Sequence, residues 1–237
     1  MVVITDTVMT EDKNLNVTPP EYANSAQPHI PLRKPAATEA ELHELIRDRW
    51  SPRAFSDQAV PAPAIRSFLE AARWAPSSMN AQPWSFIVAG RVSEPEAHER
   101  VLATLAPANA AWARRAPLLV IAVARLNHAN GAPNRHALYD TGQAVAQLTM
   151  QATADGLSVH QMGGFSVAAA TERFRIPDGY EPVAVLAIGY RDDPGVLAPE
   201  LRERELAPRS RKPLREFVHA GEWNRPLDEG APAFPIV

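Results

Sequence analysis

The sequence contains no cysteine among its 237 residues. Disulfide frameworks, thiolate zinc sites, iron–sulfur clusters and a cysteine nucleophile are therefore excluded together. Long apolar runs are missing as well, since the longest, residues 116–124, falls far short of the ~18 residues that a membrane span needs. Residues 1–17 lack the basic start and apolar stretch of a signal peptide. We therefore expect a soluble, cytoplasmic and unprocessed protein.

Neither sign of charge dominates the chain, because 24 lysines and arginines face 27 aspartates and glutamates, for a net charge of −3. No overall field attracts nucleic acid or an anionic membrane, and we expect neither as a partner. Lysine itself is scarce, at three residues, so 21 of the 24 basic residues are arginines. The planar fork of arginine suits bidentate contacts with oxyanions, although a coding bias explains such a skew equally well.

The composition, with 46% hydrophobic and 22% charged residues, is ordinary for a globular protein, and the length favours one large domain over two small ones. Residues 1–37 hold five prolines and no periodic apolar pattern, which predicts an extended or disordered arm. Residues 38–237 form the predicted domain. It opens with a capping box, Thr38 and Glu41, which predicts a helix ending near Trp50.

Apolar periodicity and turn residues predict the remaining elements. Strands and helices do not alternate strictly, which favours an α+β fold over a doubly wound sheet. The longest predicted helix has no charge between Asp140 and Asp155, so it is either the core helix or a subunit interface. We expect helices at residues 61–75, 93–105 (capped by Ser93 with Glu96), 109–114 and 134–156, strands at 84–89, 118–123, 157–161 and 183–188, and a short closing segment at 214–218.

Four short segments concentrate residues that bind oxyanions or flat ligands. In the first, Arg49 and Arg53 flank Ser51 where a helix ends, so two guanidinium groups and a hydroxyl could meet one phosphate. Taken alone, a solvated helix C-terminus explains this segment better. The second is a loop whose hydroxyls and carboxamides match the edge of a heterocycle, or equally serve an ordinary capping loop: Pro76, Ser77, Ser78, Asn80 and Gln82.

The other two segments follow later in the chain. Gly163 and Gly164 come directly after an apolar strand, where glycine lets the backbone approach a ligand, although the pair is also simply a turn. The fourth segment either closes a phosphate site or is a solvated run of charge, and its basic residues are Arg209, Arg211, Lys212 and Arg215.

Familiar nucleotide-binding and hydrolase motifs are absent from the sequence. It has no Gly-x-Gly-x-x-Gly after a strand, no P-loop and no Gly-x-Ser-x-Gly elbow. The seven histidines form no HExxH or HxH pair, so no metal site is expected.

The order and spacing of the four segments together resemble the nitroreductase family of FMN-dependent oxidoreductases. Most of the likeness lies in Arg-x-Ser-x-Arg, followed some twenty residues later by Ala-x-x-Ala-Pro-Ser-Ser-x-Asn-x-Gln-Pro-Trp at residues 72–84. It extends over residues 38–218. The resemblance implies a homodimer with two FMN sites at the subunit interface, a mixed sheet wrapped by helices, and NAD(P)H as the reductant.

The resemblance also implies which residues bind FMN. Arg49, Ser51 and Arg53 match the first contact motif, with Arg53 near the flavin N1 and C2 carbonyl. Asn109 is similar to an asparagine that contacts the isoalloxazine. The other implied contacts are Pro76, Ser77, Ser78, Asn80 and Gln82 in a loop that serves the partner subunit's flavin, Gln161, Met162, Gly163 and Gly164 beside flavin N5, and Arg209 and Arg211 in a C-terminal phosphate clamp.

Two positions depart from the family pattern. Where many members have Pro-x-Glu-Gly beside flavin N5, residues 161–164 read Gln-Met-Gly-Gly, which leaves a backbone N–H but no carboxylate. Trp112 stands where some members carry a lysine, and we expect it to add an aromatic wall to the substrate pocket.

The function implied by the resemblance is ping-pong transfer of hydride from NAD(P)H through FMN to a nitroaromatic, a quinone or a similar small electron acceptor. The flavin carries the redox chemistry, so no catalytic acid, base or nucleophile is required of the protein. Two alternatives stay open. One is a specialised flavoenzyme on the same scaffold, such as a dehalogenase, a flavin-consuming synthase or an oxidase; the other is a non-enzymatic FMN-binding module.

Overall fold

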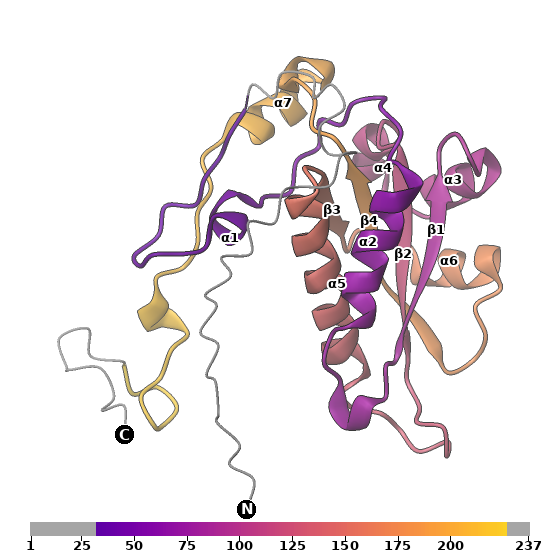
Figure 1. Cartoon of the computed structure of the whole chain (residues 1–237), viewed down its shortest axis with the longest axis vertical. Coiled ribbons are helices and arrows are strands. Elements are labelled where there is room, and N and C mark those ends of the chain that lie inside the picture. Colours follow the sequence, from indigo (N-terminus) through magenta and orange to yellow (C-terminus); the bar gives the residue numbers. More distant parts are fainter. Residues whose placement is uncertain (1–31, 227–237) are drawn as a thin grey trace, which may run out of the picture.

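A four-stranded antiparallel sheet forms the centre of the protein. The computed structural model describes residues 32–226, and Figure 1 shows how the elements are arranged. Within these residues the strand order is β1-β2-β4-β3, so β2 and β4 are the inner strands. The strands are β1 (Trp84–Gly90), β2 (Leu118–Arg125), β3 (Ser158–Met162) and β4 (Tyr180–Gly189).

Helices cover the sheet on both faces (Figure 1). The α-helices are α1 (Glu44–Asp48), α2 (Ala62–Arg73), α3 (Pro95–Leu102), α4 (Pro107–Ala113), α5 (Ala137–Ala154), α6 (Val167–Phe174) and α7 (Pro199–Leu206). Three short 3-10 turns complete the described elements: η2 (Ser78–Asn80), η3 (Pro194–Val196) and η4 (Leu214–Glu216).

The core has two apolar clusters, one on each face of the sheet. α2 and α5 pack together over one face and bury Phe68 and Leu148. α3, α4 and α6 contribute side chains to the cluster on the other face. Along β2 the side chains alternate between the clusters, with Val120 on the first and Ile121 on the second. Burial on both faces explains why this strand reads as a continuous apolar run.

The α+β class is confirmed, and the four expected strands correspond to β1 to β4. The resemblance implies a mixed sheet, whereas every pairing among the described strands is antiparallel. The reason is the strand order. β2 and β3 run in the same direction, but β4 lies between them and is antiparallel to both.

The helices expected at residues 61–75, 93–105, 109–114 and 134–156 correspond to α2, α3, α4 and α5. The helix that the capping box predicts from Thr38 is wrong in its start, because α1 begins at Glu44. His43 caps it instead, with its Nδ1 accepting the N–H of Leu45 at 3.2 Å. Leu42 and Ile46, which both lie within the range of the predicted helix, are exposed, so their side chains add no buried contacts that would hold a longer helix.

Three further details differ from the sequence-based expectations. α3 begins at Pro95 after Glu94 and has no side-chain cap, so Ser93 does not cap it. The Ser93 hydroxyl lies instead over Gly90, where a Cβ would meet it at 2.3 Å. α6 and α7 were not predicted, because the small alanines of α6 and the many charges of α7 give only a weak apolar stripe of helical period.

The predicted arm falls mostly outside the structure, since residues 1–31 are not among the described residues. Residues 32–37 form no helix or strand, and the N–H of Ala36 donates to the carbonyl of Arg47 at 2.8 Å. Between residues 32 and 226 no helix has both the length and the apolar character to cross a bilayer. The cytoplasmic location stays a prediction.

Helix α5, which carries no charge after Asp140, is part of the core on one side only. Ala144, Leu148 and Ala152 are fully buried against α2 and the sheet. On the opposite side Tyr139 is 69% exposed and Ala146 is also exposed. The sequence left core helix and subunit interface as alternatives. The structure shows the first for one face, and on the other face the described residues leave Tyr139 and Ala146 exposed.

Truncation of the core side of α5 should destabilise the fold. Leu148→Ala removes a side chain with no exposed surface, and we expect a loss of about 2–5 kcal/mol in the free energy of unfolding. Leu206→Ala, at a leucine that is 51% exposed, is the matched control and should cost far less. Urea unfolding followed by circular dichroism measures both. Equal losses would contradict the assignment of the core.

Candidate functional site

Basic side chains from three separate segments line one pocket, which we call the cationic pocket. Its volume is about 190 Å³, and its lining residues are Lys34, Arg49, Trp50, Ser51, Arg53, Arg204, Arg209 and Arg211. The structure therefore brings together the first and fourth segments singled out in the sequence. Lys34 and Arg204 are additions that the sequence did not suggest.

Lys34 connects the start of the described chain to its C-terminal part. Its Nζ donates to the carbonyl of Glu205 at 2.7 Å and lies 4.7 Å from the centroid of the Trp50 ring. In return, Nη1 of Arg209 donates to the carbonyls of Lys34 (2.6 Å) and Arg47 (2.9 Å). Arg209 thus uses one nitrogen to hold the backbone, and only its other N–H groups are available to a phosphate.

A buried glutamate, Glu205 of α7, lies behind the cationic pocket. It is 1% exposed, and its Oε1 accepts the backbone N–H groups of Arg53 (2.8 Å) and Ala54 (3.1 Å). Its Oε2 lies 3.6 Å from Nη1 of Arg53 and accepts no hydrogen bond from the described residues. The carboxylate therefore fixes the Arg53–Ala54 backbone and forms an ion pair with one cation of the pocket.

Glu205 and Lys34 were not predicted as site residues from the sequence. α7 reads as a run of charges, yet Glu205 stands four residues after Leu201, which packs against the core. Residues four apart share a helix face. A glutamate on the apolar side of α7 was therefore the signal available in the sequence. Lys34 falls in the predicted arm and had no comparable signal.

Like charges in the cationic pocket perturb one another. Burial lowers the pKa of Arg49, and the charges of Arg209 and Arg211 lower it further. Burial also lowers the pKa of Lys34; Glu205 opposes this shift, and neighbouring guanidinium groups add to it. Each shift means that positive charge is unfavourable here, and an anion would relieve it. With its fork-shaped donors, the pocket suits a phosphate group.

The third segment forms an open turn at the end of β3. A Cβ on Gly164 would come within 2.7 Å of Asn109 Nδ2, which donates to the Gly164 carbonyl at 3.0 Å. Gly163 faces open space, so its backbone is accessible to a flat ligand. The Met162 side chain is 2% exposed, so only its backbone can contribute. Gln161 is exposed, and its Nε2 donates to a threonine hydroxyl of α5 at 3.1 Å.

His160 joins β3 to the Arg49–Arg53 segment. Its Nδ1 lies 2.8 Å from the carbonyl oxygen of Pro52, and because a carbonyl can only accept, Nδ1 carries the hydrogen. Burial lowers the pKa of His160 to about 4; the bond to Pro52 opposes the shift and the charge of Arg53 adds to it. The imidazole is therefore a neutral donor near pH 7, and it bonds β3, the strand that leads to the glycine turn, to the segment that carries Arg49 and Arg53.

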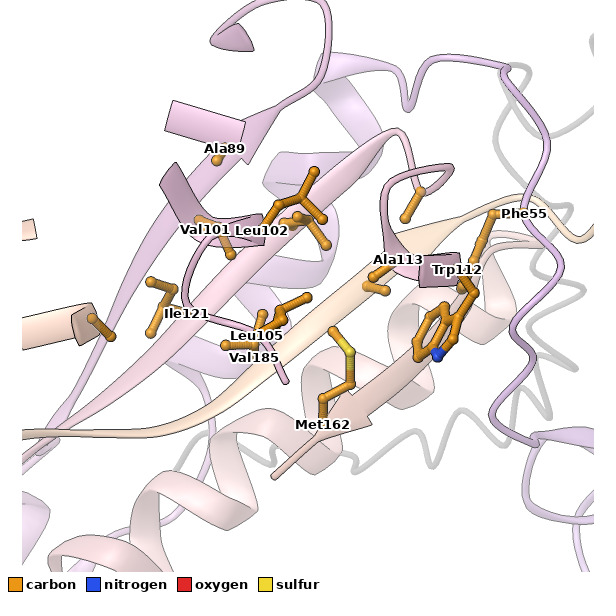
Figure 2. Packing of buried hydrophobic residues seen from close by; sticks show 14 of the residues in the cluster. Phe55, Ala89, Val101, Leu102, Leu105, Trp112, Ala113, Ile121, Met162 and Val185 are labelled. Atoms are coloured by element: carbon orange, nitrogen blue, oxygen red, sulfur yellow. The ribbon is translucent and has the colours of Figure 1, made fainter. Parts of the chain in front are cut away.

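The expectation that Trp112 forms a wall of the substrate pocket is wrong. Its side chain is 1% exposed, and Figure 2 shows it in the core together with Phe55 and Met162. The ring centroids of Trp112 and Phe55 lie 6.2 Å apart, and that of His160 lies 4.5 Å from Trp112. The cause is the orientation of α4, which turns Trp112 and Ala113 toward the sheet. Trp112 supports His160 from within.

The second segment, residues 76–82, is a tightly bonded loop. The N–H of Ser78 donates to Asp140 Oδ2, and the N–H of Gln82 donates to Ser77 Oγ, each at 3.0 Å. Three non-glycine residues of this loop have left-handed backbone. Such a conformation costs free energy in non-glycine residues and clusters at functional sites. Pro76 and Asn80 are exposed. The non-glycine residues with positive φ in the loop are Met79 (53°), Asn80 (53°) and Gln82 (43°).

Within one chain this loop does not meet the cationic pocket. The loop bonds to Asp140 at the start of α5, whereas Arg49 and Thr153 line a common pocket at the end of α5. Thirteen helical residues separate these points by about 20 Å, and Figure 1 shows them at opposite ends of the helix. That the loop serves a partner subunit's flavin stays a prediction.

Comparison with known proteins agrees with this geometry. The model of the nitroreductase family matches residues 46–190, which is more than half of the chain. The chain belongs to the nitroreductase family. This assignment confirms the resemblance drawn from the four segments. Among the described residues of this nitroreductase-family chain, no three His, Asp or Glu side chains are placed to hold a metal ion.

Individual relatives differ in how much of the chain they match. A solved structure described as an oxidoreductase containing FMN is 35% identical, with a TM-score of 0.75, and covers 79% of this chain and 96% of that one. Nitrobenzene nitroreductase of Ectopseudomonas oleovorans is 43% identical over 61 residues, which are 25% of each protein. Iodotyrosine deiodinase 1 of Sus scrofa is 30% identical over 81 residues, 34% of this chain and 27% of that protein. The chain thus spans only about a quarter of each of these two enzymes.

The low pKa of His160 predicts a stability that depends on pH. An unfolded histidine titrates near 6.5, and the folded one near pH 4. As the pH falls from 6.5 toward 4, only the unfolded state takes up this proton. The free energy of unfolding should therefore fall by up to about 1.4 kcal/mol per pH unit on account of this group.

His160→Asn tests this pH dependence, because the amide keeps a donor but does not titrate. Denaturant unfolding at pH 7, 6 and 5 should show a shallower decline for the variant than for the wild type. Parallel declines would mean that His160 titrates normally in the folded protein.

Proposed function

We propose that this nitroreductase-family protein is an FMN-dependent oxidoreductase that passes hydride from NAD(P)H to a nitroaromatic, a quinone or a similar small acceptor. The observation that carries the proposal is the cationic pocket. Pro52, between the lining residues Ser51 and Arg53, is bonded to His160 of β3, the strand that ends in the open glycine turn. The relative described as containing FMN supports FMN as the flavin.

The residues present fit FMN at both of its ends. The FMN phosphate carries about −1.5 to −2 charges, which Arg49, Arg211 and the free N–H groups of Arg209 would balance. The accessible backbone at Gly163 leaves room for a planar ring system. The fit therefore involves a charged part and a flat part of one ligand.

Bound FMN supplies reversible two-electron chemistry, so the protein has to bind, orient and polarise it. Arg53 matches the family residue near the flavin N1 and C2 carbonyl, and a fixed cation at that edge stabilises negative charge there. The bonds from Glu205 to the Arg53–Ala54 backbone would keep this cation in place. NAD(P)H and the acceptor would use the same side of the pocket in turn, which gives ping-pong kinetics.

A dehalogenase on the same scaffold is the second candidate. The similarity to a deiodinase favours it, as does the glycine at position 163, which leaves the acceptor side open. The absorbance spectrum before and after anaerobic addition of NAD(P)H separates the candidates. Bleaching of a yellow protein supports hydride transfer from NAD(P)H, whereas a yellow protein that does not respond supports the specialised enzyme or a non-enzymatic FMN-binding module.

Loss of one cation from the pocket should weaken FMN binding. Arg211→Ala removes a charge-assisted bond that contributes about 1.5–3 kcal/mol, so the dissociation constant should rise roughly ten- to hundredfold. Arg215→Ala is the control, since Arg215 lies outside the pocket lining. Titration of flavin fluorescence gives both constants. Equal affinities for the two variants would place Arg211 in solvent and refute its role in the clamp.

We also propose that the protein is a homodimer built on the exposed side of α5. This side carries no charge between Asp140 and Asp155, and beside it lies an open, mainly apolar hollow of about 340 Å³. Small residues let two backbones approach closely. The hollow is lined by Leu45, Ala71, Ala146, Gln147, Met150, Gln151 and Ala154.

A charge on this side of α5 should break the dimer. Ala146→Glu places a carboxylate on an exposed position of the proposed interface, whereas Ala168→Glu places one on the exposed side of α6. Sedimentation should show monomers for the first variant and dimers for the second, and the first should also lose FMN if each site needs two chains. A wild-type monomer that still holds FMN would refute the shared site.

A further inference from the structure

We propose that Glu205 is a positioning residue of the cationic pocket: it holds the Arg53–Ala54 backbone in place and limits how tightly the pocket binds a phosphate group. This inference rests on the proposed function in one respect, namely that the phosphate belongs to FMN. Its test with inorganic phosphate does not depend on that identity.

The first part of the inference follows from hydrogen bonding. Two consecutive N–H groups, of Arg53 and Ala54, donate to the same oxygen of Glu205, and the glutamate is 1% exposed. Water cannot replace an acceptor at such depth without cost, because an unsatisfied buried donor destabilises a structure by roughly 1–3 kcal/mol. The carboxylate therefore determines where the chain turns beside the pocket.

The second part follows from charge. Glu205 places a negative charge 3.6 Å from Arg53 Nη1, at the back of a pocket lined by Lys34 and five arginines. A carboxylate there attracts the same guanidinium group that would face a bound anion. It also repels the anion directly through a poorly solvated region. Glu205 therefore lowers the affinity of the pocket for phosphate while it orders the pocket wall.

Two substitutions separate these effects. Glu205→Gln keeps an oxygen that accepts both N–H groups but removes the charge, so phosphate and FMN should bind about fivefold or more tightly. Glu205→Ala removes the charge and the acceptor together, so both ligands should bind more weakly than they do to Glu205→Gln. Glu203→Gln is the matched control, because Glu203 is an exposed glutamate on the same helix.

The experiment uses the full-length protein and two readouts. Dilution of the FMN-loaded protein, followed by the fluorescence of released flavin, gives the dissociation constant of FMN. Calorimetric titration with inorganic phosphate gives that of the anion alone. Tighter binding to Glu205→Gln, with Glu203→Gln unchanged and Glu205→Ala weaker than Glu205→Gln, is the expected result.

Two outcomes overturn the proposal, and a third overturns the proposed function instead. If Glu205→Gln binds phosphate as the wild type does, the carboxylate has a structural role only. If Glu205→Ala binds as tightly as Glu205→Gln, the two hydrogen bonds do not order the pocket. If the wild type binds phosphate but not FMN, the proposed function fails, and the phosphate data still decide the role of Glu205.

Discussion

Repulsion between like charges is the constraint on which the arrangement around the cationic pocket depends. Lys34 and five arginines share the walls of a space of about 190 Å³, and burial of Arg49 adds to the cost of keeping it charged. The fold offsets this cost with acceptors from distant segments. Carbonyls of Lys34 and Arg47 hold Arg209, the carbonyl of Glu205 holds Lys34, and the Glu205 carboxylate is the buried anion behind them. A pocket held together in this way favours an anionic ligand, and FMN with its phosphate is the one that the family suggests.

The rest of the fold connects the glycine turn to the segment that carries this charge. β3 brings the glycine turn to the edge of the described sheet, and His160 bonds that strand to Pro52 in the pocket wall. Trp112 packs in the core against His160, and burial lowers the pKa of that histidine. α5 separates the loop of residues 76–82 from the pocket by about 20 Å. Under the proposed function, one chain would supply the phosphate site and the glycine turn, and the loop would serve a second chain.

Much of the fold could be predicted from the sequence, because buried strands and long helices leave strong periodic patterns. β2 and α5 are examples, since both contribute several apolar side chains to the core. Elements with weaker patterns were missed or misplaced. The capping box predicted a longer helix than α1, and Leu42 and Ile46 in that range are exposed. The alanines of α6 and the charges of α7 give only a weak apolar stripe. In the site, Arg49, Arg53 and Arg211 carry recognisable spacing. Lys34 has no such spacing, because the carbonyl that its Nζ bonds lies 171 residues away in the chain. Glu205 has only its place four residues after Leu201, since the N–H groups that it accepts lie 151 and 152 residues away. Trp112 was misjudged since a sequence does not show which side of a seven-residue helix faces the core.

The central claim is that the cationic pocket binds the phosphate of FMN. A direct test compares the affinities of the protein for FMN and for riboflavin, which has the same ring and side chain but no phosphate. Two or more charge-assisted bonds of about 1.5–3 kcal/mol each predict that FMN binds at least a hundredfold more tightly. Fluorescence titration of both flavins measures this ratio. Equal affinities would contradict the claim, because the arginines and Lys34 would then contribute nothing to flavin binding.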